Sequence, residues 1–149
     1  MSNWRQFSVD ELVPHAGKMA LLERVVEFDW EKVVAEAVVR GDGLFGDECS
    51  VPAWLGIEYM AQTIAAMGGM KRRLLGESIN LGFLLGTRRY ECNVDRFEVG
   101  TVLKISVRRL IQDQGLGVFD CRIEGEGILA TAKLNVYQPD TEVNRVITD

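Results

Sequence analysis

The sequence is poor in the residues that build disulfides, zinc sites and histidine-based catalytic relays. Its 149 residues include three cysteines and one histidine. Cys49, Cys92 and Cys121 are odd in number and show no C-x-x-C spacing, which argues against a disulfide framework and against a zinc site. We therefore expect reduced thiols, as is usual in cytosolic proteins, and no metal or other cofactor.

A basic excess and long apolar runs are missing too. The net charge is −5, from 17 basic and 22 acidic residues, which argues against a nucleic-acid partner. Residues 1–10 lack the basic and apolar regions of a signal peptide. No stretch reaches the roughly 18 apolar residues of a membrane span. The sequence therefore predicts a cytoplasmic protein that binds neither nucleic acid nor a membrane.

The composition is that of an ordinary globular protein, with 47% hydrophobic and 26% charged residues. The length falls within the usual range of one domain, about 100–200 residues. We therefore predict a single domain over residues 1–149.

The first third of the chain predicts a short helix and two strands. Ser8 begins Ser-Val-Asp-Glu, a capping box that predicts a helix over residues 8–13, ended by Pro14. Residues 19–39 are dense in β-branched side chains and are interrupted by a polar stretch at 29–32, which indicates two strands joined by a turn. Residues 41–51 are rich in Gly and Asp and predict a loop.

The longest periodic segment begins at Pro52, a residue suited to the first turn of a helix. Its apolar residues occupy nearly all sides until the basic residues 71–73, and Gly76 ends it. A helix that is apolar all round is buried, so other elements must wrap it. Strand candidates follow at 81–90, 101–111, 116–123 and 128–137. One buried helix followed by antiparallel strands predicts an α+β fold with a sheet curled around a central helix.

The segment from Gly43 to Gln62 resembles a family motif. It reads Gly-Leu-Phe-Gly-Asp-Glu-Cys-Ser-Val-Pro-Ala-Trp-Leu-Gly-Ile-Glu-Tyr-Met-Ala-Gln. It aligns without a gap with G-H-F-P-G-H-P-x-x-P-G-x-x-x-x-E-x-x-A-Q of the bacterial 3-hydroxyacyl-ACP dehydratases, which have the hot-dog fold. Residues 13–25 and the segments starting at Phe83 and Phe97 resemble the flanks of that motif, so the resemblance extends from about residue 12 to 137. It implies a single hot-dog domain.

The resemblance breaks at the chemistry. The first motif His, which is the family's catalytic base set against the Glu of a partner protomer, is Leu44 here, and the second is Glu48. The motif Gly after Pro52 is Ala53, and the one histidine of the chain is His15. This pattern resembles the divergent ApeP-like branch of aryl-polyene and similar type II polyketide pathways.

The resemblance implies a 3-hydroxyacyl-[acyl-carrier-protein] dehydratase of fatty-acid or polyene and polyketide biosynthesis. Its partners would be an acyl carrier protein bearing a phosphopantetheine thioester and a second hot-dog subunit, in a homodimer or a heterodimer. Two alternatives stay open. One is a catalytically impaired subunit that pairs with an active dehydratase, which Leu44 favours. The other is a hot-dog thioesterase, in which Glu58 would activate water.

Dehydration needs a base at C2, an acid for the C3 hydroxyl and donors for the thioester oxygen. Glu58 is the candidate acid, because its apolar neighbours favour the protonated carboxyl. The alternative is a Glu at the dimer seam that forms an ion pair or reaches solvent. Gln62 lies one turn further and is expected either to orient Glu58 or the substrate, or to pack at the seam. The donors would come from Ala53 or Trp54, since Pro52 has no N–H.

The remaining candidates have two interpretations each. His15 is either a base that replaces the missing one or a structural side chain bonded within its turn. Cys49 lies nearest the motif, and packing is the more ordinary role for it. Residues 71–73, 88 and 89 are all basic and are interpreted as one patch for the acidic carrier protein or as solvated surface. Ala61 and Ala65 are the predicted contact between two paired helices.

Overall fold

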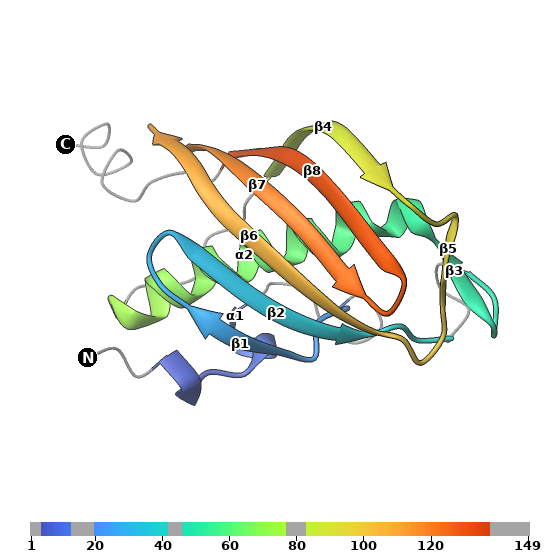
Figure 1. Ribbon diagram of the computed structural model, residues 1–149. Coiled ribbons are helices and arrows are strands. Elements are labelled where there is room, and N and C mark those ends of the chain that lie inside the picture. Colours follow the sequence, from blue (N-terminus) through green and yellow to red (C-terminus); the bar gives the residue numbers. More distant parts are fainter. Residues whose placement is uncertain (1–3, 13–19, 42–45, 77–82, 138–149) are drawn as a thin grey trace.

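The computed structural model describes residues 4–12, 20–41, 46–76 and 83–137. A six-stranded antiparallel sheet, in the order β1-β2-β6-β7-β8-β4, curls over helix α2 (Figure 1). The strands are β1 (Arg24–Phe28), β2 (Lys32–Val38), β3 (Ser50–Pro52), β4 (Phe83–Cys92), β5 (Arg96–Glu98), β6 (Val102–Asp113), β7 (Leu116–Gly125) and β8 (Ile128–Tyr137). The helices are η1 (Trp4–Gln6), α1 (Val9–Leu12), η3 (Ala53–Leu55) and α2 (Gly56–Leu74). The predicted α+β class and hot-dog fold are confirmed.

Helix α2 buries large apolar side chains against the concave face of the sheet. Tyr59, Met60, Met67 and Met70 are all at most 2% exposed. Each contributes on the order of 1.5–3 kcal/mol through the area removed from water. Along β6, β7 and β8, buried side chains alternate with exposed or half-buried ones over most of each strand, as a half-buried antiparallel sheet requires. The buried helix predicted from the apolar pattern is therefore confirmed.

The predicted capping box forms at the start of α1. The Glu11 carboxylate accepts hydrogen bonds from the Ser8 N–H at 3.1 Å and from the Ser8 hydroxyl at 3.2 Å. Helix α1 packs on α2 (Figure 1) so closely that a Cβ at Gly69 would lie 2.0 Å from the carbonyl oxygen of Leu12. Glycine is therefore needed at that crossing.

The strand predictions are confirmed with shifts of a few residues, but two short strands, β3 and β5, were missed. The predicted loop over residues 41–51 contains part of β3, which pairs with β5 as a two-stranded ribbon. Its register joins Val51 to Phe97, and both side chains are buried. The ribbon lies beside the start of α2 (Figure 1), so it holds the segment that leads into the candidate site.

Two surfaces of the described chain stay uncovered. Ala61 and Ala65 are half-buried on one side of α2, where we expect the partner helix. Strand β4 is an edge of the sheet, and Leu84 and Leu85 on it are 44% and 60% exposed. An unpaired edge with exposed leucines is an aggregation liability unless another chain covers it. The predicted dimer is compatible with both surfaces.

Candidate functional site

Glu58 and Gln62 form a hydrogen-bonded pair one helical turn apart on α2. The side-chain amide of Gln62 donates to the Glu58 carboxylate at 3.0 Å. The Gln62 side chain is 1% exposed, whereas Glu58 is half-buried. The amide oxygen of Gln62 in turn accepts the backbone N–H of Leu21 at 2.8 Å. Gln62 therefore links the carboxylate to the segment that enters β1.

The environment of the Glu58 carboxylate bears on both interpretations of this residue. Among the residues that the structure describes, its carboxylate contacts an amide, and no Lys or Arg lies within ion-pair distance. Glu58 also lies along the same side of α2 as Ala61 and Ala65, the half-buried side. The acid role of Glu58 and its placement at a dimer seam both stay predictions.

The turn that precedes α2 is fixed from two sides. Pro52 lies at the end of β3 in an extended conformation, with φ −65° and ψ 144°. The Ala53 N–H donates to the carbonyl oxygen of Asp95 at 2.8 Å. The hydroxyl of Tyr90 donates to the carbonyl oxygen of Ala53 at 2.5 Å. The turn is thus attached to the β4–β5 connection and to strand β4.

This geometry corrects one expectation. The Ala53 N–H is engaged with Asp95, so the donors for a thioester oxygen do not begin at Ala53. Trp54 is the other predicted donor, and its side chain is 61% exposed, which puts this residue at the surface. Contacts of Pro52, Ala53 and Trp54 with a substrate remain predictions. Tyr90 was missed, because no local sequence signal relates a strand residue to this turn.

Two predicted site residues, His15 and Leu44, lie outside the described residues. Of the cysteines, Cys49 is exposed, Cys92 is half-buried and Cys121 is buried, and all three are free thiols. Burial is the main cause that raises the pKa of Cys121 to about 12, which makes this thiol inert at neutral pH. Among the described residues, no group of three or more His, Cys, Asp or Glu side chains gathers as a metal site.

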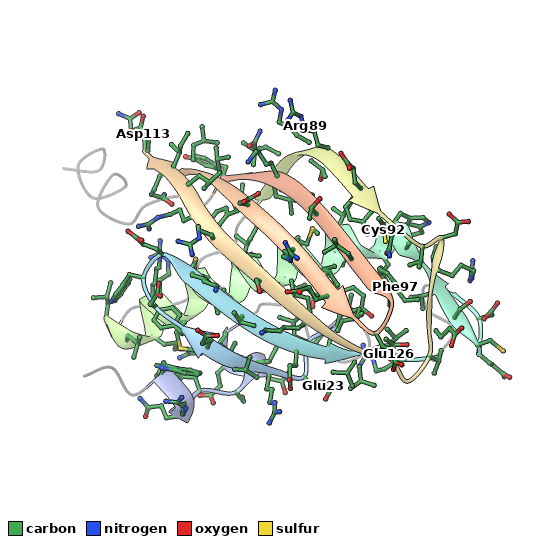
Figure 2. The ribbon with its side chains drawn as sticks, in the orientation of Figure 1. Glu23, Arg89, Cys92, Phe97, Asp113 and Glu126 are labelled. Atoms are coloured by element: carbon green, nitrogen blue, oxygen red, sulfur yellow. The ribbon has the colours of Figure 1, made fainter. Side chains whose placement is uncertain are left out.

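The residues of the predicted basic patch do not all lie at one place on the fold. Lys71 lies near the turn between β1 and β2, where its Nζ is 5.6 Å from the ring centroid of Trp30. Arg88 and Arg89 lie on β4 (Figure 2 labels Arg89), and β1 and β4 are opposite edges of the sheet. Lys71 and the pair Arg88 and Arg89 are therefore associated with opposite edges of the sheet.

Lys71 is unusual among the basic residues. Its burial, and then the nearby charge of Arg109, lower its pKa to about 8, while Asp29 and Glu31 act in the opposite direction. The unfolded chain keeps the ordinary lysine pKa of 10.5. Between these two values the unfolded state binds more protons than the folded state. The contribution of Lys71 to stability therefore rises with pH from about 8 to about 10.5.

We compare the free energy of unfolding of the wild type with that of Lys71→Met. The difference, wild type minus variant, should rise between pH 8 and pH 10.5. Below pH 8 both states carry the ammonium, and the folded chain bears the cost of burying it. Cys121 and Tyr90, whose pKa values burial raises, have the opposite pH dependence, but both proteins share it and the difference cancels it. Urea unfolding at pH 7, 8, 9 and 10 measures this, and a flat difference would contradict it.

Known proteins with the same fold resemble this chain. The family model described as ApeP dehydratase, ApeP-like, matches residues 7–148. A chain of the dehydratase heterocomplex ApeI:P from Xenorhabdus doucetiae is 36% identical, covers 96% of this chain and 99% of its own length, and superimposes with a TM-score of 0.81. No match was found among curated proteins.

More distant structures share the fold. The PaaI protein of the phenylacetic acid degradation operon of E. coli is 14% identical over 76% of this chain and 80% of its own, with a TM-score of 0.57. A hypothetical thioesterase from Streptococcus pneumoniae, solved with coenzyme A, is 16% identical over 77% and 84%, with a TM-score of 0.54. In the described residues, no helix is long and apolar enough to cross a membrane. The extent of the family match and the 36% identity show that this chain belongs to the ApeP-like dehydratase family.

Proposed function

We propose that this chain supplies the acid Glu58 to a dehydratase site that it shares with a second hot-dog subunit. The substrate is a 3-hydroxyacyl thioester. The observation that supports this most directly is the Glu58 carboxylate, held by Gln62 on the half-buried side of α2. Leu44 occupies the position of the catalytic histidine in the motif of the bacterial 3-hydroxyacyl-ACP dehydratases, so the base has to come from another residue.

In the proposed reaction a histidine of the partner removes a proton from C2 of the acyl chain. Negative charge develops on the thioester oxygen, where the Trp54 N–H and the start of α2 stabilise it. Glu58 donates its proton to the C3 hydroxyl, which leaves as water while the C2–C3 double bond forms. The proton on the histidine then returns to Glu58 or to solvent, so both groups are ready for another turnover.

The likeness to a chain of a dehydratase heterocomplex supports a heterodimer over a homodimer. In a homodimer both sites would lack the motif histidine, because both would carry Leu44. In a heterodimer with a subunit that keeps this histidine, one site would combine that histidine with Glu58. Acyl carrier protein is the proposed donor of the thioester, and the exposed Arg88 and Arg89 on β4 offer cations to its acidic surface.

The test is reconstitution. The purified chain, a histidine-bearing hot-dog dehydratase subunit and their mixture are assayed for hydration of a crotonyl thioester and for dehydration of its 3-hydroxy counterpart. We expect full activity in the mixture only, and loss of that activity when the partner's motif histidine is replaced by alanine. Full activity of this chain alone would overturn the shared site.

His15 is the base of the competing possibility, since it is the one histidine in the sequence. His15→Ala in the active mixture separates the two. Under the proposal its rate stays near that of the wild type. A loss on the order of 10²–10⁴ would assign general-base catalysis to His15 instead.

A further inference from the structure

Tyr90 connects the edge strand of the sheet to the turn that begins α2. Its hydroxyl donates to the carbonyl oxygen of Ala53, which also accepts the N–H of Gly56. The Ala53 N–H is bound to the Asp95 carbonyl oxygen at 2.8 Å. Both peptide groups of Ala53 are therefore held by residues that lie outside the turn, and Tyr90 supplies the side-chain contact.

A β-bulge turns Tyr90 toward the helix. In the pairing of β4 with β8, Arg88 lies opposite Lys133, but Glu91 lies opposite Thr131, so β4 has one extra residue between these pairs. Arg89 takes up the bulge with φ 55°, in the left-handed region. Without the bulge, Tyr90 would be opposite Thr131 on the outer face, because side chains alternate along a strand. Figure 2 shows Arg89 projecting from this edge and Cys92 further along the same strand.

Gly56 gives the hydroxyl its space. A Cβ at Gly56 would lie 2.1 Å from the Tyr90 hydroxyl oxygen and 3.0 Å from the ring carbon that bears it. Any side chain at Gly56 would displace the tyrosine or the turn. Burial, followed by the nearby Cys92, raises the pKa of Tyr90 above its ordinary range. Its hydroxyl thus remains protonated, and able to donate a hydrogen bond, at neutral pH.

We propose that Tyr90 is a positioning residue that holds the turn 52–55 so that the Trp54 N–H faces the thioester oxygen. This rests on the proposed function, because the turn matters to catalysis only if it stabilises that oxygen. Within the described part of the chain, hydrogen bonds join Tyr90 to Ala53 and Glu58 to Gln62, and none joins Tyr90 to Glu58. It acts by fixing the Ala53 peptide, and thereby the peptide that follows it.

Amide hydrogen exchange tests the positioning without any activity. Tyr90→Phe removes the hydroxyl and keeps the ring. We expect the amides of Ala53 and Gly56 to exchange about tenfold faster, as loss of one hydrogen bond implies. Tyr137→Phe is the matched control, because Tyr137 is 40% exposed at the end of β8. Unchanged exchange of both amides in Tyr90→Phe would overturn the proposal.

Kinetics of the reconstituted enzyme test the consequence for catalysis. Tyr90→Phe should lower kcat on the order of tenfold to a hundredfold with little change in KM, because a small misplacement of a group that acts in the transition state has this effect. An unchanged kcat would overturn the role of Tyr90 in catalysis. If the wild-type mixture itself is inactive, the proposed function fails, whereas the exchange measurement still decides whether Tyr90 holds the turn.

Gly56→Ala supplies a second variant with its own expectation. In the wild-type background the added Cβ meets the tyrosine hydroxyl, so kcat should fall. In the Tyr90→Phe background the hydroxyl is gone and the same substitution should cost less. If the fold-loss in kcat of the double variant equals the product of the two single losses, the two residues do not act through their contact. That result would count against the proposal.

Discussion

Glu58→Gln is expected to lower the rate of dehydration by the reconstituted enzyme by about 10²–10⁴, the usual size of a general acid contribution. The glutamine keeps the shape of the side chain and an oxygen that can accept the Gln62 amide at the present 3.0 Å. It has no proton of suitable acidity for a leaving hydroxyl. The loss should therefore appear in kcat, with the free energy of unfolding within about 0.5 kcal/mol of the wild type.

The control for this substitution is Glu126→Gln, in the exposed turn between β7 and β8 (labelled in Figure 2). It removes the same charge in a turn outside α2 and should leave both kcat and stability unchanged. Hydration of a crotonyl thioester, followed by the loss of its absorbance, measures all three proteins in one assay. Wild-type activity of Glu58→Gln in the mixture would exclude Glu58 as the acid and would leave Leu44 as one of two inert motif positions.

The fold was predictable because its main signals are local and repeated. The central helix was predicted from apolar residues on nearly all of its sides, because a helix with this pattern has to be buried. The strands follow from β-branched runs bounded by turn residues, as at Asp29, whose carboxylate accepts the N–H groups of Glu31 and Lys32 at 2.8 Å each. The β3–β5 ribbon was missed because each of its strands has three residues, too short for a period to appear.

The pair Glu58 and Gln62 was predictable for a similar reason. Four residues along a helix bring two side chains together whatever the rest of the chain does. The link from Gln62 to Leu21 was not predictable, because it joins residues 41 positions apart. The hydrogen bond from the Ala53 N–H to the Asp95 carbonyl oxygen was unpredictable for the same reason, because the pairing of β3 with β5 brings these two distant residues together.

The role of Tyr90 and the separation of the basic residues depend on details that sequence patterns do not contain. One extra residue in β4 decides which face of the sheet Tyr90 occupies, and nothing in Arg-Arg-Tyr-Glu marks the bulge. Similarly, Lys71 and Arg89 were grouped by charge alone, whereas the order of the strands places β1 and β4 at opposite edges. Both depend on the pairing of strands that are distant in the sequence.

Gln62→Met is expected to affect both stability and activity. The substitution removes the acceptor of the Leu21 N–H, a bond of 2.8 Å in a buried setting, and an orphaned buried donor costs about 1–3 kcal/mol. It also removes the amide that holds the Glu58 carboxylate, so kcat should fall while Glu58 itself is intact. Urea unfolding and the exchange rate of the Leu21 amide measure the first effect, and turnover by the reconstituted enzyme measures the second.

Thr63→Val is the matched control, one residue along the same helix. Thr63 is 0% exposed and its hydroxyl donates to the carbonyl oxygen of Tyr59 at 2.8 Å. That carbonyl keeps its helical N–H when the hydroxyl is lost, so no buried group is orphaned and the cost should stay below about 1 kcal/mol. If Gln62→Met and Thr63→Val lose equal stability and both keep the wild-type kcat, Gln62 only fills space. A larger loss of stability in Gln62→Met, together with faster exchange at Leu21 and a lower kcat, would show that one buried amide both closes the chain onto α2 and orients the acid.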